Sequence, residues 1–273
     1  MITVITFNSI PALNPTFKYE RLGQMAIANR RQYCLRHGYR FVCEGEMAAD
    51  RPACWAKIPA VLDAFERSEW VLWADSDTLV MNPERGLEEF CDPAFDLVVA
   101  SQEEFFRRIG VPPAEGLARM PINTGVFLMR GSEWSKELLR GAWEERQFIS
   151  HGAIWNGIGE QEAMIHLLQQ QPAGLARIKY VAGLQNHPKL YREGDLFLHF
   201  YGNHARHRVP VGECEEVFAR WEAADASGGP LPEDRCRFHW CSIQNKEPQG
   251  PMDRGDLARY LYEPQDIEPF RLN

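Results

Sequence analysis

Two hydrophobic periods alternate along the chain, one typical of buried strands and one typical of amphipathic helices. Short apolar runs rich in β-branched residues predict strands, and apolar positions three and four residues apart predict helices. The predicted strands are Ile2–Phe7 and residues 39–43, 70–74, 97–100, 122–129 and 196–201. The predicted helices are residues 20–37, 55–67, 134–143 and 160–168. This alternation favours an α/β fold in which a Rossmann-like, mostly parallel central sheet carries helices on both faces.

The turn residues indicate one large domain followed by an extension. The stretch DASGGPLPED at residues 225–234 is the clearest break, so we expect a domain at residues 1–224 and a smaller, irregular extension at residues 225–273 that packs on it. Residues 102–120 form a long turn-rich stretch. It fits a substrate lid or acceptor loop, and it fits a disordered surface loop equally well.

Composition and charge exclude several classes of function. The chain carries a net charge of −8 with a pI near 5.6, which argues against a nucleic-acid or anionic-membrane partner. No apolar run is long enough for a membrane span, and the N-terminus lacks the basic segment of a signal peptide. The seven cysteines form no C-x-x-C pair, so we expect reduced thiols in a cytoplasmic protein.

The run VLWADSDTLVMNP at residues 71–83 ends a predicted strand on two aspartates one residue apart. If the strand reaches them, Asp75 and Asp77 point the same way off its end. Two adjacent carboxylates repel each other unless a cation lies between them. A divalent ion held by few protein ligands keeps open positions for phosphate oxygens. The pattern therefore predicts a metal–diphosphate site at the carboxyl edge of the sheet.

Candidates for a third metal ligand and for phosphate contacts lie downstream. His199 ends the predicted strand LFLHF, and an imidazole ligand suits Mn2+ and allows it over Mg2+. The segment HFYGNHARHR adds His204, Arg206 and Arg208 to an acidic protein. That charge complements a diphosphate, although such a cluster also fits a solvated basic turn.

Two enzyme classes place a D-x-D pair after a strand. In haloacid-dehalogenase-like phosphatases, Asp75 would be the nucleophile and Asp77 the general acid and base. Against this class, several predicted elements precede the motif, and its downstream acidic partner is missing. In nucleotide-sugar glycosyltransferases of the GT-A fold, the pair holds a divalent ion that neutralises the leaving nucleoside diphosphate. A non-catalytic protein that only binds a sugar nucleotide is the third alternative.

Six blocks of the chain, in order, resemble glycosyltransferase family 34, which includes fungal α-galactosyl- and α-mannosyltransferases and plant xyloglucan α-xylosyltransferases. The blocks are NRRQYCLRHGYRF (29–41), CWAKIPAVLDAF (54–65), EWVLWADSDTLVMN (69–82), INTGVFLMRGSEWS (122–135), GEQEAMIHLL (159–168) and HFYGN (199–203). Together these blocks are far more specific than a D-x-D pair alone.

The resemblance implies a metal-dependent, retaining transfer of a sugar from a nucleotide donor, UDP before GDP, to a hydroxyl of a glycan or other acceptor. By position, the metal ligands for Mn2+ or Mg2+ would be Asp75, Asp77 and His199. Donor contacts would come from Lys57, Ser76 and the Asn123–Thr124–Gly125 turn. Glu160 and Gln161 would lie beside the anomeric carbon.

Two departures from the family pattern change these expectations. The family usually places a diphosphate-binding lysine five residues after the metal-binding histidine, where this chain has His204. Arg206 or Arg208 would then take over that contact. The membrane anchor and stem of Golgi members are also missing from this sequence, which favours a cytoplasmic enzyme whose substrate need not be the eukaryotic one.

Overall fold

The computed structural model describes residues 1–7, 18–44, 50–108, 110–149, 159–186 and 190–199. Its strands are β1 (Ile2–Phe7), β2 (Arg40–Glu44), β3 (Trp70–Ala74), β4 (Thr78–Val80), β5 (Leu97–Ala100), β6 (Val126–Arg130), β7 (Ile178–Val181), β8 (Gln185–Asn186) and β9 (Phe197–His199). Its α-helices are α1 (Lys18–His37), α2 (Lys57–Ala64), α3 (Glu103–Arg108), α4 (Pro113–Arg119), α5 (Glu133–Glu144) and α6 (Glu160–Gln170).

The central sheet has six strands in the order β2-β1-β3-β6-β5-β7. Strands β1, β2 and β3 pair in parallel, as do β5 and β7, whereas β6 runs antiparallel to both of its neighbours. The mostly parallel sheet is therefore as expected, with one reversed strand. Because β6 is reversed, its first residue Val126 pairs with Ala74 at the end of β3, which places the chain just before β6 at the carboxyl edge.

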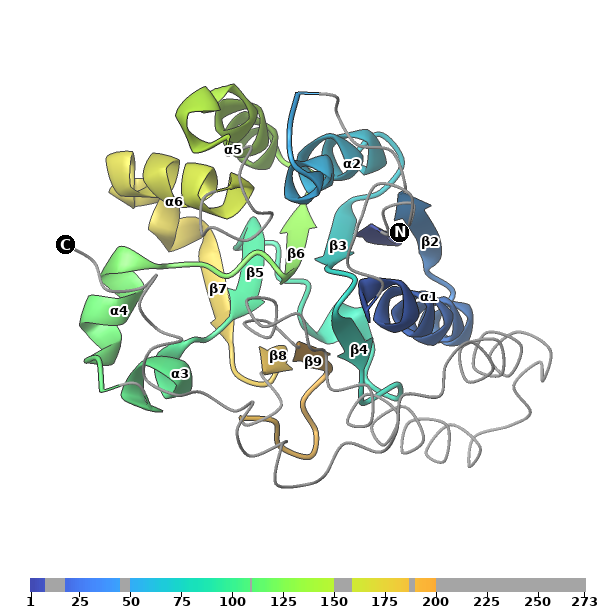
Figure 1. Cartoon of the computed structure of the whole chain (residues 1–273). Helices are drawn as coiled ribbons and strands as arrows, with labels where there is room; N and C mark the ends of the chain where they lie inside the picture. Colours follow the sequence, from blue (N-terminus) through green and yellow to red (C-terminus); the bar gives the residue numbers. More distant parts are fainter. Residues whose placement is uncertain (8–17, 45–49, 109, 150–158, 187–189, 200–273) are drawn as a thin grey trace.

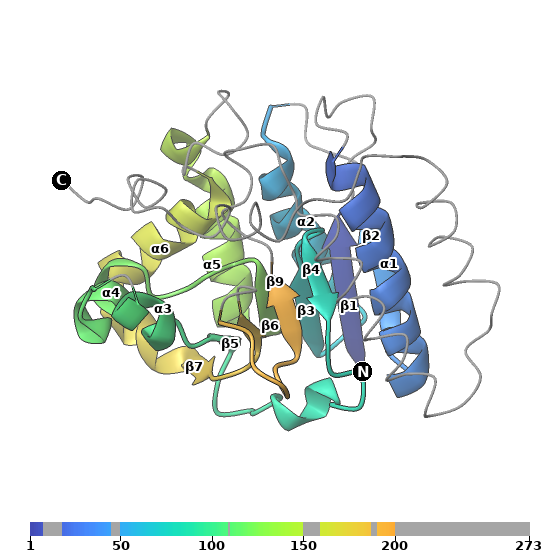
Figure 2. The same cartoon turned by 60° about the horizontal axis from the view of Figure 1, so that its bottom comes forward.

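Helices cover the two faces of the sheet unequally. Helices α2, α5 and α6 pack on one face, and α1 packs on the other together with a small second sheet (Figures 1 and 2). Alternate strand residues supply the two cores, since side chains of a strand point to opposite faces. Val71 and Trp73 of β3 belong to the core under α2, α5 and α6, while Trp70 and Leu72 belong to the other core.

The second sheet brings the end of the described chain to the acidic motif. It has the order β4-β9-β8, with β4 antiparallel to β9 and β8 parallel to it. Thr78 is paired with His199 in the register of β4 and β9. This pairing places His199 beside Asp77, although the two residues are far apart in the sequence.

Side chains of α1 hold the segment that follows β3 by its backbone. Asn29 donates from Nδ2 to the carbonyl of Val80 at 3.0 Å and accepts from the Val80 N–H at 2.7 Å. The Tyr33 hydroxyl donates to the carbonyl of Arg85 at 2.6 Å. These bonds satisfy backbone groups of an irregular segment and so fix its path over the sheet.

Several elements differ from the sequence expectation. The helix predicted at residues 55–67 is shorter, with α2 ending at Ala64, and the strand predicted at residues 122–129 begins only at Val126. Residues 102–120, expected as a loop, contain α3 and α4. These helices are short, and their glycine and prolines hide the helical period. Gly116 faces the ring of Phe106 so closely that a Cβ would lie 2.3 Å from Cγ, which explains the glycine.

The predicted extension at residues 225–273 lies outside the described residues, as do residues 200 and 201 of the last predicted strand. Within the described part of the chain, no helix combines the length and the apolar character that crossing a membrane requires.

Candidate metal and donor site

The two aspartates of the D-x-D motif lie in a tight turn between β3 and β4. The N–H of Asp75 donates to the carbonyl of Gly125 at 2.8 Å, and the N–H of Thr78 donates to the carbonyl of Asp75 at 3.2 Å. Strand β3 ends at Ala74, so strand alternation is not what brings the carboxylates together. The turn does this instead, and Ser76 between them is partly exposed.

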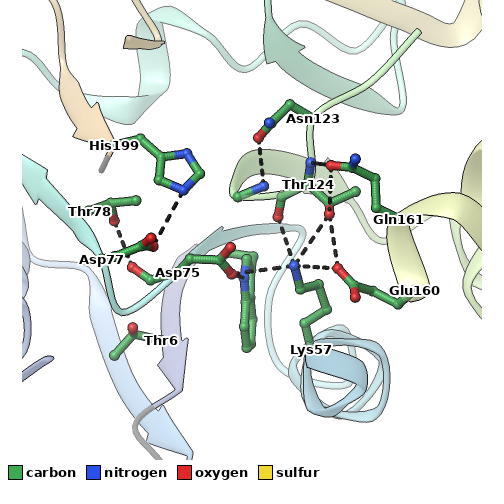
Figure 3. Close-up of polar contacts among 12 residues, drawn as sticks. Thr6, Lys57, Asp75, Asp77, Thr78, Asn123, Thr124, Glu160, Gln161 and His199 are labelled. Atoms are coloured by element: carbon green, nitrogen blue, oxygen red, sulfur yellow. Dashed lines mark hydrogen bonds and ion pairs between the residues drawn. The ribbon is translucent and has the colours of Figure 1, made fainter. Parts of the chain in front are cut away.

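Asp75, Asp77 and His199 form one cluster, as the sequence predicts (Figure 3). One ligand atom from each lies within 4.8 Å of the other two, and His199 Nε2 is 3.4 Å from Asp77 Oδ1. Asp77 and His199 are buried, while Asp75 is partly exposed. Two carboxylates and one imidazole supply three protein ligands, fewer than such a divalent ion takes, so further positions would remain for oxygens of a substrate.

The chemistry of this cluster fits a divalent ion. Burial and the neighbouring charge of Asp77 raise the pKa of Asp75, although Lys57 and His199 oppose that rise. A cation between the carboxylates would remove their repulsion. Mixed oxygen and imidazole ligands suit Mn2+ and allow it over Mg2+. Gly125 is also shaped to this site, because a Cβ there would lie 2.0 Å from His199 Cε1.

A buried arginine, Arg30, binds the backbone of the turn that carries Asp75 and Asp77. Arg30 is fully buried and donates to the carbonyl of Thr78 at 2.8 Å, with further hydrogen bonds to the carbonyl of Asp75 and to the Thr78 hydroxyl. Its other terminal nitrogen donates to Thr6 Oγ1 at 2.6 Å. Burial lowers the pKa of Arg30 to about 10, although Asp75 and Asp77 counteract this. The guanidinium therefore stays charged at neutral pH and fixes the backbone that carries the carboxylates.

Lys57 is buried between two carboxylates. Its Nζ lies 2.6 Å from Glu160 Oε1 and 3.3 Å from Asp75 Oδ1, and its side chain is 3% exposed. It also donates to the Thr124 carbonyl at 3.1 Å. Burial disfavours its charge, but Asp75 and Glu160 outweigh burial and raise the pKa of Lys57. Lys57 is thus no solvated surface charge, and it is held by Asp75, Glu160 and the Thr124 carbonyl.

The loop before β6 joins the metal cluster to the start of α6. The N–H of Thr124 donates to Gln161 Oε1 at 2.9 Å, and its hydroxyl donates to Glu160 Oε1 at 3.0 Å. The N–H of Gly125 donates to Asn123 Oδ1 at 2.9 Å. The predicted Asn123–Thr124–Gly125 turn and the Glu160–Gln161 pair are therefore in direct contact (Figure 3).

Helix α6 begins at Glu160, so its N-terminus lies at this site, whereas α2 continues directly from a 3-10 helix at Ala53–Ala56 and has no free N-terminus at Lys57. Helix N-termini carry partial positive charge and favour anions nearby. Lys57 neutralises one buried carboxylate, and the remaining negative charge gathers at Asp75 and Asp77. The arrangement can hold a divalent cation at one end and a polar ligand along the 123–125 loop.

Three residues that contact this site were not predicted from sequence. Trp73, expected as a core side chain, donates from Nε1 to Asp75 Oδ1 at 2.6 Å. Arg30 lies within an unremarkable helical pattern, and Gln185 reaches the Nδ1 of His199 with its Oε1 at 2.7 Å. The only sequence signal for Arg30 was its position, because the helical period of α1 places this cation on the buried face of the helix.

The basic residues predicted to contact the diphosphate, His204, Arg206 and Arg208, lie outside the described residues. Their contacts with a donor remain predictions. The same holds for the role of His204 in place of the family lysine.

Comparisons with known proteins identify relatives of this chain. The chain is 29% identical over 211 residues to an uncharacterized alpha-1,2-galactosyltransferase of Schizosaccharomyces pombe, covering 64% of this chain and 55% of that protein. It is 27% identical over 260 residues to an alpha-1,2-galactosyltransferase of the same yeast, covering 82% of this chain and 64% of that protein. The chain therefore spans between half and two thirds of the length of these relatives.

A crystal structure of a glycosyltransferase involved in the glycosylation of the major capsid of PBCV-1 superposes with a TM-score of 0.55 at 21% sequence identity. The match covers 79% of this chain and 98% of that one. This likeness shows the GT-A fold. The haloacid-dehalogenase-like alternative is therefore wrong, because its chemistry belongs to a different fold.

The sequence model of the galactosyl transferase GMA12/MNN10 family matches residues 1–94 and 118–210, which is more than half of the chain. The unmatched stretch between these two parts, residues 95–117, includes α3 and part of α4. Asp75, Asp77, Glu160 and His199 all lie within the matched parts. This chain belongs to the galactosyl transferase GMA12/MNN10 family, glycosyltransferase family 34.

Proposed function

We propose that this protein is a metal-dependent, retaining glycosyltransferase that moves a hexosyl or pentosyl unit from a nucleotide sugar to a hydroxyl of a glycan or other acceptor. A UDP-sugar is the donor we propose. The observation that carries the proposal is the cluster of Asp75, Asp77 and His199, which lies at the carboxyl edge of a GT-A sheet in a chain that matches the family model.

Asp75, Asp77 and His199 would hold Mn2+, or Mg2+ in its place. When bound, the ion supplies positive charge to the phosphate oxygens of the leaving nucleoside diphosphate. The protein positions these ligands through Arg30 and through the β4–β9 pairing. Arg206 or Arg208 would add a charge-assisted hydrogen bond to the same diphosphate, in the role of the family lysine, with His204 beside them.

The sugar of the donor would lie along the 123–125 loop. Asn123 is partly exposed there, Thr124 and Gly125 are buried directly beside it, and Ser76 lies between the metal-binding aspartates. Lys57 contributes by holding Asp75 and Glu160 in place. We propose that the buried charge of Lys57 offsets part of the negative charge of Asp75 and Glu160 on the donor side of the site.

Glu160 and Gln161 would act beside the anomeric carbon. Retention needs one of two routes. Either a carboxylate attacks the anomeric carbon on the face opposite the leaving group, or the acceptor hydroxyl attacks on the same face from which the nucleoside diphosphate departs, within one ion pair. Lys57 Nζ and the Thr124 hydroxyl lie 2.6 and 3.0 Å from Glu160 Oε1, and Gln161 accepts the Thr124 N–H with its side-chain oxygen. These contacts orient both side chains in the place that the proposal gives to the sugar.

Product analysis tests the proposal. The purified protein is incubated with a panel of UDP- and GDP-sugars, Mn2+ and hydroxyl acceptors, and the anomeric proton of the product is assigned by NMR. We expect Mn2+-dependent transfer with the anomeric configuration of the donor. An inverted linkage would remove the proposed role of Glu160. Donor binding without transfer to any acceptor would instead leave a sugar-nucleotide-binding protein.

A further inference from the structure

Gln185 of β8 connects the metal-ligand cluster with the loop that precedes β6. Its side chain is buried, with a residue exposure of 5%. Gln185 Oε1 lies 2.7 Å from His199 Nδ1, and Gln185 Nε2 donates to Asn123 Oδ1 at 3.0 Å. One amide thus contacts both a metal ligand and a residue of the proposed sugar pocket.

The backbone N–H of Gly125 sets the direction of each hydrogen bond in the series Gly125–Asn123–Gln185–His199. A backbone N–H only donates, so the bond from Gly125 N at 2.9 Å fixes the oxygen of Asn123. That oxygen accepts a second bond from Gln185, which must present its NH2 group. The oxygen of Gln185 therefore faces His199 and can only accept. His199 must therefore carry a proton on Nδ1, which leaves Nε2, 3.4 Å from Asp77 Oδ1, as the ring nitrogen on the side of the metal site.

Strand β8 is itself held firmly in place. The N–H groups of Leu196 and Phe197 donate to the carbonyls of Gly183 and Leu184 at 2.7 and 3.0 Å. Asn186 Nδ2 donates to Asp195 Oδ2 at 2.7 Å. Gln185 consequently has a fixed backbone from which to orient the imidazole.

We propose that Gln185 is a positioning residue that selects the metal-binding tautomer of His199 and couples the metal site to the 123–125 loop. This inference deepens the proposed function and rests on it for the donor. Hydrogen bonds to the second nitrogen of a metal-bound imidazole orient the ring and set its tautomer, and their loss lowers metal affinity about 10- to 100-fold.

Two substitutions separate the two contacts. Gln185→Leu removes both hydrogen bonds at similar volume, and we expect Mn2+ affinity to fall about 10- to 100-fold. Gln185→Glu keeps an oxygen for His199 Nδ1 but places a second acceptor opposite Asn123 Oδ1. We expect this variant to bind Mn2+ at least as tightly as the wild type. Its apparent donor affinity should fall about 5- to 10-fold, the scale of one hydrogen bond.

Mn2+ affinity is measured by electron paramagnetic resonance without nucleotide, and donor affinity by calorimetry with a UDP-sugar at saturating Mn2+. Gln102→Leu is the matched control, because it replaces another buried glutamine, whose Nε2 donates to the Met120 carbonyl at 3.2 Å and not to a metal ligand, and it should bind Mn2+ like the wild type. Melting without metal separates lost folding from lost metal binding, since only the metal-induced rise in Tm should shrink in Gln185→Leu.

Wild-type Mn2+ affinity in a folded Gln185→Leu protein would overturn the inference. If Gln185→Leu does not fold, the Gln185→Glu variant tests the inference. Retained Mn2+ binding with weakened donor binding would support the coupling of the metal site to the 123–125 loop by Gln185. Equal loss of both, or no change in either, overturns it. Failure of the proposed function is distinguishable, because a wild-type protein that transfers no sugar would still show the tautomer effect on Mn2+ binding.

Discussion

Replacing Lys57 with methionine removes the cation that lies between the carboxylates of Glu160 and Asp75. Lys57 Nζ lies 2.6 Å from Glu160 and 3.3 Å from Asp75, and the Glu160 side chain is 5% exposed. Methionine keeps most of the volume and the apolar stem but supplies no charge. The substitution therefore leaves Glu160 as a buried carboxylate without its cation.

The cost follows from this burial. Removing one partner of a buried ion pair costs about 3–5 kcal/mol, because the other charge stays uncompensated. At roughly 2–4 °C per kcal/mol for a protein of this size, Tm should fall by about 6–20 °C. The pKa of Lys57 is raised above its ordinary value of 10.5, so the stabilisation is complete below that pH and is lost only as pH rises through the folded-state pKa. A neutral buffer therefore measures it in full.

A double-mutant cycle isolates the pair. Glu160→Gln alone should cost less, about 1–3 kcal/mol, because Lys57 keeps Asp75 as a partner. In the double variant the buried charge is gone, so its cost should be smaller than the sum of the single costs by at least ~1 kcal/mol. Unfolding in urea or guanidinium gives all four stabilities at pH 7 without metal.

The control is a lysine–carboxylate pair at a partly exposed position, with the same 3.3 Å separation as the Lys57–Asp75 contact. Lys179 Nζ lies 3.3 Å from Asp92 Oδ2, with side-chain exposures of 28% and 36%. Lys179→Met should cost much less than Lys57→Met, because solvent screens this pair. If Lys57→Met costs no more than this control, or if the cycle is additive within ~0.5 kcal/mol, the reasoning about the buried pair is refuted.

Three further predictions follow from single positions. Gly125→Ala should abolish measurable Mn2+ binding in electron paramagnetic resonance while the protein stays folded, because a Cβ there would lie 2.0 Å from His199 Cε1; unchanged binding would contradict the site geometry. Arg30→Met should lower Tm and weaken Mn2+ binding at least ~10-fold, since the turn that carries the aspartates loses its hydrogen bonds, with Arg30→Lys between it and the wild type. Burial and Glu160 raise the pKa of Glu162 from 4.5 to about 7, so the folded state binds the extra proton and loses stability as pH rises through that range. At pH 8 the free energy of unfolding of Glu162→Gln should therefore exceed that of the wild type by about 2–3 kcal/mol, at ~1.4 kcal/mol per pKa unit, and Tm should be higher. At pH 4.5 the two proteins should melt at the same temperature. Equal melting at both pH values would contradict the raised pKa.

Local patterns predicted the parts of the fold that depend on near neighbours. The strands β1, β3 and β5 have the bounds that their apolar runs predict. Helix α1 ends at His37, before Gly38 with φ +71°, as the glycine indicated. Such signals are reliable because the burial pattern and the terminating residue lie within one element.

Pairings between distant segments could not be read from the chain. Nothing local indicates that β6 runs antiparallel to β3, or that β4 leaves the central sheet to pair with β9. The D-x-D carboxylates and His199 were predicted from residue type, but their meeting depends on this second sheet. Arg30 and Gln185 were missed for the same reason, since their roles come from contacts across the fold and not from neighbours in the sequence.

The most direct test of the central claim is a titration of the wild-type protein with Mn2+, followed by electron paramagnetic resonance with and without UDP. The account predicts one tightly bound ion whose affinity rises when UDP is present. Asp77→Asn should lose this ion, and His199→Ala should bind it at least ~10-fold more weakly, both without loss of fold. Equal Mn2+ binding by the wild type and Asp77→Asn, or full transfer activity in EDTA, would contradict the claim that Asp75, Asp77 and His199 share one catalytic ion.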